Sequence, residues 1–232
     1  MAPAKRFCVL TTGRTGSTSL MDALASWDDI LVPGKIVPCV DNELLHPEFV
    51  ASYRRQFGEI AGKSIDDGEG LIEAFFALDR GCGYAGFKSM PNRHERFETF
   101  VARSDLRFTV LLRRDVTATV ASFAVAARTG SWRRRGGPPA VWTFRSEDRS
   151  RVLDLIAYIY RSIESLKSVP SAIRLSYEDL CDPSYSSREL DDFFGRSIKL
   201  RAPNPPVRPE DYVTNYSELD RFVRAALKHL AA

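Results

Sequence analysis

Residues 6 to 20 join an apolar run, a glycine-bearing turn and the start of a helical pattern. Gly13 and Gly16 allow a positive φ and a close backbone approach, so successive amide N–H groups can point into one concavity at the positive end of a helix dipole. A phosphate fits such a turn. The residues that we expect to form this anion loop are Thr12, Gly13, Arg14, Thr15, Gly16, Ser17 and Thr18.

The anion loop differs from the ATP-binding P-loop, which has a lysine directly before its hydroxyl residue. Here Gly16 precedes Ser17, and the cation is Arg14 inside the loop. The difference argues against ATP with magnesium as the ligand. A strand followed by a turn of Gly, Ser and Thr is also a common plain connection, so a functional interpretation needs a second site.

A second phosphate site is indicated about a hundred residues later. The apolar run 106–112 ends at Arg113 and Arg114, and Asp115 is suited to cap a following helix. Ser122 comes eight residues after Arg114, roughly two helical turns, so both side chains can reach one sheet edge. The structural alternative is an arginine pair at a sheet edge and a small serine at a helix contact.

Together these segments resemble those of sulfotransferases that use 3′-phosphoadenosine 5′-phosphosulfate (PAPS). In that family the first loop holds the 5′-phosphosulfate, and an arginine followed at i+8 by a serine holds the 3′-phosphate. The resemblance implies that the anion loop binds the 5′ end and that Arg114 and Ser122 bind the 3′-phosphate. It also implies that the product is 3′,5′-bisphosphoadenosine (PAP).

A third match is the segment Leu-Ser-Tyr-Glu-Asp-Leu at 175–180, which looks like a family segment after a late strand. In some branches its tyrosine approaches the adenine, which implies a purine contact for Tyr177. The anion loop is most similar to that of bacterial carbohydrate and glycolipid sulfotransferases. The arginine-lysine-glycine clamp of the cytosolic animal branch does not occur here, and Arg201 and Arg208 are the nearest candidates to replace it.

Sulfuryl transfer requires in-line attack and positive charge at the sulfonate and at the leaving oxygen. Arg14, inside the loop, is the best placed cation. Lys88, at the end of a predicted strand, is the second choice, although an exposed strand-end lysine is equally compatible with the sequence.

The reaction also requires a base for the proton of the acceptor. We favour Glu43, because the segment 41–47 resembles a glutamate-containing stretch of the bacterial members in which the glutamate faces the acceptor hydroxyl. A solvated or capping glutamate is the structural alternative. His46 is the rival base, with a reference pKa nearer neutrality, and Asp41 is a weaker rival.

Composition limits the function class. The 232 residues are 44% hydrophobic and 27% charged, which is typical of a globular chain and predicts one domain over 1–232. A net charge of +3 is too small for a general nucleic-acid binder. The three histidines have no neighbouring ligand set, so we expect no metal. No apolar run approaches the roughly 18 residues of a membrane span, so we expect a cytoplasmic protein without integral membrane contact.

Helical patterns alternate with short apolar runs, which predicts an α/β fold with a mostly parallel sheet covered on both faces. The resemblance to sulfotransferases implies that this is a P-loop-like three-layer fold. We expect strands near 6–12, 84–89, 107–112 and 171–175. We expect helices near 17–26, 47–57, 69–79, 92–103, 116–128, 147–167, 184–194 and 216–230.

Two stretches, 130–147 and 201–215, are predicted to be long connections. The first combines aromatic and cationic side chains directly after the helix of Ser122. We interpret it as a lid over the acceptor, and a solvated loop is the alternative. The side chains concerned are Trp132, Arg133, Arg134, Arg135, Trp142, Phe144 and Arg145.

The resemblance therefore implies a PAPS-dependent sulfotransferase. Its acceptor is expected to be a hydroxyl of a carbohydrate, glycolipid or other small molecule, with no nucleic-acid partner. A P-loop nucleotide kinase and a nucleotide-binding protein without catalysis remain as alternatives. The oligomeric state is left open.

Overall fold

A parallel β-sheet forms the centre of the molecule. The computed structural model describes residues 4–37, 42–62, 64–78, 81–130, 141–198 and 208–231. Within them one five-stranded sheet has the order β2-β3-β1-β4-β5, and all neighbouring strands are parallel. The strands are β1 (Lys5–Thr11), β2 (Ile30–Leu31), β3 (Tyr84–Ser89), β4 (Leu106–Leu112) and β5 (Ile173–Ser176).

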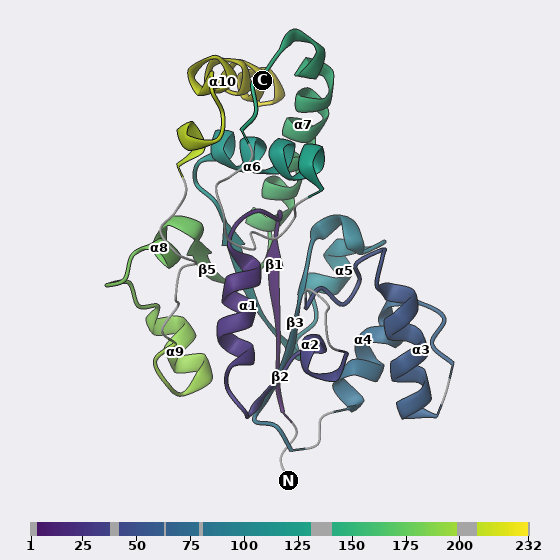
Figure 1. The fold of residues 1–232 in the computed structure, drawn as a ribbon. Coiled ribbons are helices and arrows are strands. Elements are labelled where there is room, and N and C mark those ends of the chain that lie inside the picture. The colour runs from purple at the N-terminus through teal and green to yellow at the C-terminus, as the bar shows by residue number, and fades with distance from the viewer. Residues whose placement is uncertain are drawn as a thin grey trace.

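Helices cover both faces of the sheet and stand beyond the carboxyl ends of its strands (Figure 1). Helices α1, α8 and α9 pack on one face, α3, α4 and α5 on the other, and α6, α7 and α10 lie above. The expected three-layer α/β fold is confirmed. The helices are α1 (Ser17–Ala25), α2 (Pro33–Ile36), α3 (Val50–Ala61), α4 (Gly68–Ala77), α5 (Phe97–Val101), α6 (Val116–Thr129), α7 (Arg149–Lys167), α8 (Tyr177–Cys181), α9 (Arg188–Phe194) and α10 (Tyr216–Leu230), with 3₁₀ turns η1 (Pro91–Arg93), η2 (Ser146–Asp148) and η3 (Pro209–Asp211).

The predicted strands correspond to β1, β3, β4 and β5. Strand β2 is not predicted, because its two residues are too few to produce a recognisable alternation. The helix expected over 92–103 is wrong in extent. It is interrupted between η1 and α5, where His94 has an extended backbone with φ −113° and ψ 127°.

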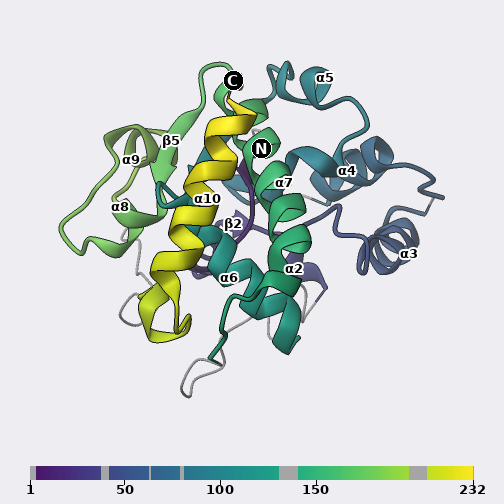
Figure 2. The same ribbon diagram turned by 90° about the horizontal axis from the view of Figure 1, so that it is seen from above.

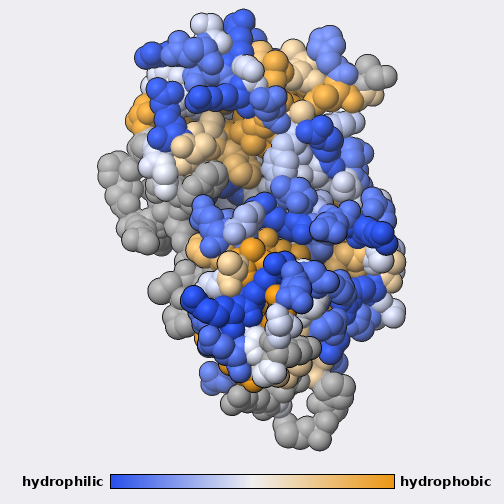
Figure 3. All heavy atoms as spheres, turned by 90° about the vertical axis from the view of Figure 1, so that its right-hand side faces the viewer, coloured by the Kyte–Doolittle hydropathy of each residue, from blue (hydrophilic) through white to orange (hydrophobic). Residues whose placement is uncertain are grey.

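Two hydrophobic cores lie on the two faces of the sheet. Because side chains alternate along a strand, Cys8 and Leu10 of β1 face α3 to α5, whereas Phe7 and Val9 face α1 and α9. Figure 3 looks onto the side of α3, α4 and α5 and shows mostly hydrophilic groups with hydrophobic areas between them. Within the described residues, no helix is both long and apolar enough to cross a membrane.

A third core joins α6, α7 and α10, which lie side by side when the molecule is seen from above (Figure 2). Trp142 and Phe144 belong to this core and are 5% and 2% exposed. Trp142 forms a parallel bridge with Val213, which joins the ends of the two predicted connections. The acceptor contact expected of these two aromatic residues is therefore wrong, because buried side chains cannot contact an acceptor.

Gly86 provides a test of the packing between β1 and β3. It lies opposite Phe7 in the strand register, and a Cβ atom at Gly86 would lie 2.5 Å from the Phe7 ring. Overpacking of this kind costs about 1–3 kcal/mol, so Gly86→Ala should lower the free energy of unfolding by at least that amount. In a Phe7→Leu background, urea denaturation should show that Gly86→Ala lowers the free energy of unfolding by less.

Gly83→Ala is the matched control, because a Cβ atom there would meet its nearest neighbour, an oxygen of Asp29, at an ordinary 3.4 Å. It should change the free energy of unfolding little. Equal costs of Gly86→Ala in the wild-type and Phe7→Leu backgrounds would contradict this account.

Candidate functional site

The candidate site lies at the carboxyl ends of the parallel strands. Strand β1 is hydrogen-bonded to β3 on one side and to β4 on the other. Parallel strands end at the same sheet edge, where ligands of open α/β sheets bind. The anion loop after β1 and the segment after β4 are therefore neighbours in space, although about a hundred residues separate them in the chain.

The anion loop has the backbone that its glycines predict. Gly13 and Gly16 have φ of 84° and 77°, and Arg14 between them also lies in the left-handed region, with φ 55°. Such a φ costs a non-glycine residue about 1–2 kcal/mol, so surrounding contacts must hold Arg14 in place.

The hydroxyl groups of the loop are largely turned inward. Thr12, Thr15 and Ser17 are buried, whereas Thr18 is half-buried. The hydroxyls of Thr11 and Thr15 are hydrogen-bonded to each other, and the amide of Gly13 donates to Thr11 Oγ1 at 3.2 Å. These bonds fix the loop ahead of any ligand.

Aromatic side chains pack against both glycines of the loop. A Cβ atom at Gly13 would lie 2.9 Å from the ring of Phe123, and one at Gly16 would lie 2.9 Å from the ring of Tyr177. Phe123 comes from α6 and Tyr177 from the start of α8. Glycine is therefore required at both positions by packing as well as by φ.

Arg14 and Ser122 are brought together. The Nε atom of Arg14 donates to Ser122 Oγ at 2.9 Å, across 108 positions of sequence. This bond connects the anion loop to α6 and helps to hold Arg14 in its left-handed conformation. Ser122 thus orients the cation of the loop.

Arg114 is held by acidic side chains after β5. Its Nη2 donates to Asp179 Oδ1 and its Nε to Ser176 Oγ, while its backbone amide donates to Glu178 Oε2 at 3.1 Å. The side chain remains 66% exposed. A phosphate at Arg114 would therefore have to compete with carboxylates. The predicted helix cap is confirmed, since Asp115 Oδ1 accepts from the amide of Ala118 at 2.8 Å.

Sequence reasoning assigned no role to Arg113, which lies between two tyrosines. Its guanidinium stands 4.6 Å from the ring centroid of Tyr177, and burial is the main cause that raises the Tyr177 pKa to about 12. The pKa of Tyr212 is also raised by burial, against the opposing charges of Arg113 and Arg14. Arg113 and Arg14 thus both lie near Tyr212.

Glu43 and Lys88 are also brought together. Glu43 forms an isolated parallel bridge with Lys88, and the Lys88 amide donates to the Asn42 carbonyl at 2.8 Å. Both residues are buried, with 1% and 2% exposure. The Nε atom of Arg93 donates to Glu43 Oε1 at 2.8 Å. Sequence reasoning did not identify Arg93, because no local pattern relates it to Glu43.

The contacts of the other predicted site residues are with their neighbours in the sequence. His46 is half-buried, its ring packs on Phe49 at 4.9 Å, and its Nδ1 accepts from the Glu48 amide at 3.3 Å. Arg208 is exposed, and its backbone amide donates to Asp211 at 3.1 Å. Asp41, Arg201 and residues 131–140 lie outside the described residues.

A half-buried apolar wall stands beside Gly13. It consists of Met90, Phe123 and Tyr158, which come from three separate elements of the chain. The Tyr158 hydroxyl contacts the Met90 sulfur at 3.5 Å, and the rings of Phe123 and Tyr158 meet edge to face at 6.3 Å. This wall offers an apolar face next to the anion loop.

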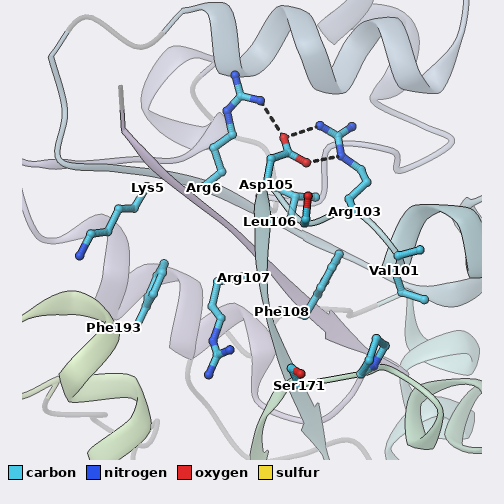
Figure 4. A pocket seen from close by; sticks show the side chains of 13 residues that line it. Lys5, Arg6, Val101, Arg103, Asp105, Leu106, Arg107, Phe108, Ser171 and Phe193 are labelled. Atoms are coloured by element: carbon cyan, nitrogen blue, oxygen red, sulfur yellow. Dashed lines mark hydrogen bonds and ion pairs between the residues drawn. The ribbon is translucent and has the colours of Figure 1, made fainter. Parts of the chain in front are cut away.

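A cavity of about 470 Å³ lies at the opposite, amino-terminal edge of the sheet (Figure 4). Asp105 at its wall accepts hydrogen bonds from Arg103 and Arg6. The bond from Arg103 is the main cause that lowers the Asp105 pKa to about 2. None of the predicted site residues lines this cavity, so we assign it no part in the chemistry.

Comparison with known proteins adds no family assignment. No protein-family model matches the chain, and no curated protein matches it significantly. In the part of the chain that the structure describes, no group of three or more His, Cys, Asp or Glu side chains gathers as a metal site. The function is therefore argued from the residues and their geometry.

His94, at the carboxyl end of β3, provides a pH test of this region. Its Nε2 is hydrogen-bonded to Ser89 Oγ at 2.8 Å, its ring stacks on Phe100 at 3.8 Å, and burial lowers its pKa from 6.5 to about 4. Between these two pKa values, His94 is protonated in the unfolded chain but not in the folded one. The free energy of unfolding should therefore fall as the pH drops through this window.

The expected loss is on the order of 3 kcal/mol on acidification below the folded-state pKa of His94. Denaturation across this pH range should show a weaker dependence in His94→Phe, which keeps the stacking on Phe100 but cannot titrate. Ser89→Ala should retain the dependence, because burial is its cause. An unchanged dependence in His94→Phe would refute the assignment.

Proposed function

We propose that this chain is a PAPS-dependent sulfotransferase that transfers a sulfonate to a hydroxyl of a carbohydrate, glycolipid or other small molecule. The observation that carries the proposal is the pairing of β1 with β4, which sets the anion loop and the segment of Arg114 at one sheet edge. The hydrogen bond from Arg14 to Ser122 joins them. Two such segments side by side suit a nucleotide with anionic groups at both its 5′ and 3′ positions.

Nucleotide binding in this proposal uses backbone amides and arginines. The amides of the anion loop hold the 5′-phosphosulfate at the amino end of α1, where the helix dipole favours negative charge. Arg114 holds the 3′-phosphate after leaving Asp179. The exchange is feasible because an exposed ion pair contributes about 0–1 kcal/mol, whereas a charge-assisted bond to phosphate contributes about 1.5–3 kcal/mol.

The chemical step is an in-line displacement at sulfur. The acceptor oxygen forms a bond to sulfur, the bond from sulfur to the 5′-phosphate oxygen breaks, and PAP leaves with that electron pair. Glu43 takes the proton of the acceptor hydroxyl. Arg14 and Lys88 supply positive charge to the sulfonate and leaving oxygen.

The direct test is sulfonate transfer from labelled PAPS to extracts of glycans, lipids and hydroxyl metabolites, with mass identification of the product. We expect a sulfated product and turnover that persists in EDTA. Turnover that requires magnesium and ATP would favour a nucleotide kinase. Tight PAP binding without transfer to any acceptor would favour a non-catalytic nucleotide-binding protein.

Arg114→Ala should weaken PAPS binding by roughly 10- to 100-fold, through loss of the charge-assisted bond to the 3′-phosphate. Binding of adenosine 5′-phosphosulfate, which lacks the 3′-phosphate, should not change. Calorimetric titration measures both affinities. Arg188→Ala is a matched control, because Arg188 is also exposed and paired with an acid, Asp192 at 3.7 Å. Equal losses for both nucleotides would exclude Arg114 as the 3′-phosphate ligand.

Glu43→Gln should lower the turnover number by about 10²- to 10⁴-fold, because glutamine keeps the size and polarity of the side chain but cannot accept the proton. PAP affinity should remain unchanged in titration. His46→Ala is the comparison variant and should retain most of the turnover. The opposite pattern, with activity kept in Glu43→Gln and lost in His46→Ala, would assign the base to His46.

A further inference from the structure

Glu43 and Arg93 form a partly buried ion pair at the edge where the acceptor would lie. We infer that Arg93 is a positioning residue that holds the Glu43 carboxylate in place and aims it at the acceptor hydroxyl, an inference that rests on the proposed function. The two residues are 50 positions apart, and the Nε–Oε1 distance is 2.8 Å. Their exposed fractions are 20% for Arg93 and 1% for Glu43.

The Glu43 side chain is buried, and the Arg93 guanidinium is its charged partner. A carboxylate removed from water without a partner favours its neutral form, which cannot act as a base. The guanidinium of Arg93 opposes this effect through charge and a directed hydrogen bond. Among the described residues, no hydrogen bond engages the second oxygen, Oε2, and the inference assigns the acceptor's proton to this oxygen.

The backbone around Arg93 is anchored on both sides. Pro91 fixes the start of η1, and the Arg93 amide donates to the Met90 carbonyl at 3.0 Å. The following residue, His94, is bonded to Ser89 at 2.8 Å and stacked on Phe100. Arg93 therefore approaches Glu43 from a rigid turn, as expected of a group that orients another.

Three other titratable residues lie near this pair. Lys88 of β3 pairs with Glu43 through the backbone, His46 lies in the same turn as Glu43, and Tyr158 comes from α7. Burial is the main cause that raises the Tyr158 pKa, with a lowering effect of Arg93 and a raising effect of Glu43. Tyr158 therefore stays neutral near pH 7, and Arg93 is the side-chain cation bonded to Glu43 within the described structure.

Arg93→Met removes the charge and the donor but keeps an extended side chain. We expect the turnover number at neutral pH to fall roughly tenfold or more, with unchanged PAP affinity. The acid limb of the rate–pH profile should move to higher pH, because a buried carboxylate without its cation binds protons more tightly. Arg93→Lys should recover part of the rate, because it keeps the charge without the planar guanidinium.

Arg96→Met is the matched control, because Arg96 is exposed three positions further along the same connection and should leave the rate and its pH profile unchanged. In the Glu43→Gln background, Arg93→Met should cause no further loss of rate. An unmoved acid limb, or a loss that adds in full to that of Glu43→Gln, would overturn the inference.

A second measurement keeps this inference separable from the proposed function. Infrared difference spectra of Arg93→Met, titrated through neutral pH, should contain a protonated carboxyl band that disappears in Arg93→Met/Glu43→Gln. This band needs no turnover. Its absence would overturn the inference even in an active enzyme, whereas its presence in a protein that transfers no sulfonate would refute only the proposed function.

Discussion

Hydrogen bonding of β1 on both sides is the constraint on which the site depends. The register pairs β1 with β3 and with β4, and all these strands run in one direction. The segments that follow them must therefore meet at one edge. The anion loop, the bridge of Glu43 to Lys88 and the turn at Arg114 each follow or extend one of these strands. A shift in this pairing would separate the anion loop from the segments that follow β3 and β4.

Packing of helices against the loops then holds an unfavourable backbone. Arg14 has φ 55°, and its conformation is supported by the bond to Ser122 and by the ring of Phe123 against Gly13. Tyr177 supports Gly16 in the same way from α8. These contacts come from the helices after β4 and β5, so the shape of the loop depends on the tertiary fold. Preorganised amides lose little freedom on binding an anion.

Local patterns in the sequence predict local structure well, but they do not predict which distant residues contact one another. The glycine spacing indicates the anion loop, and Asp115 is predicted as a helix cap; the structure confirms the positive φ values and the cap. Glu43 and Arg93 are 50 positions apart, and their pairing depends on how β3 continues into η1. The acceptor contact predicted for Trp142 is wrong, because the apolar faces of α6, α7 and α10 bury its side chain, and these faces come from distant parts of the chain.

The proposed function requires that the site recognise a nucleotide with phosphates at both the 3′ and the 5′ position of the ribose. Calorimetric titration with PAP, 5′-AMP and ATP tests this most directly. We expect PAP to bind more tightly than 5′-AMP by roughly 10- to 100-fold, the contribution of one charge-assisted phosphate contact, with the same affinity in EDTA. Equal affinities for PAP and 5′-AMP, or tighter binding of ATP that requires magnesium, would contradict the account.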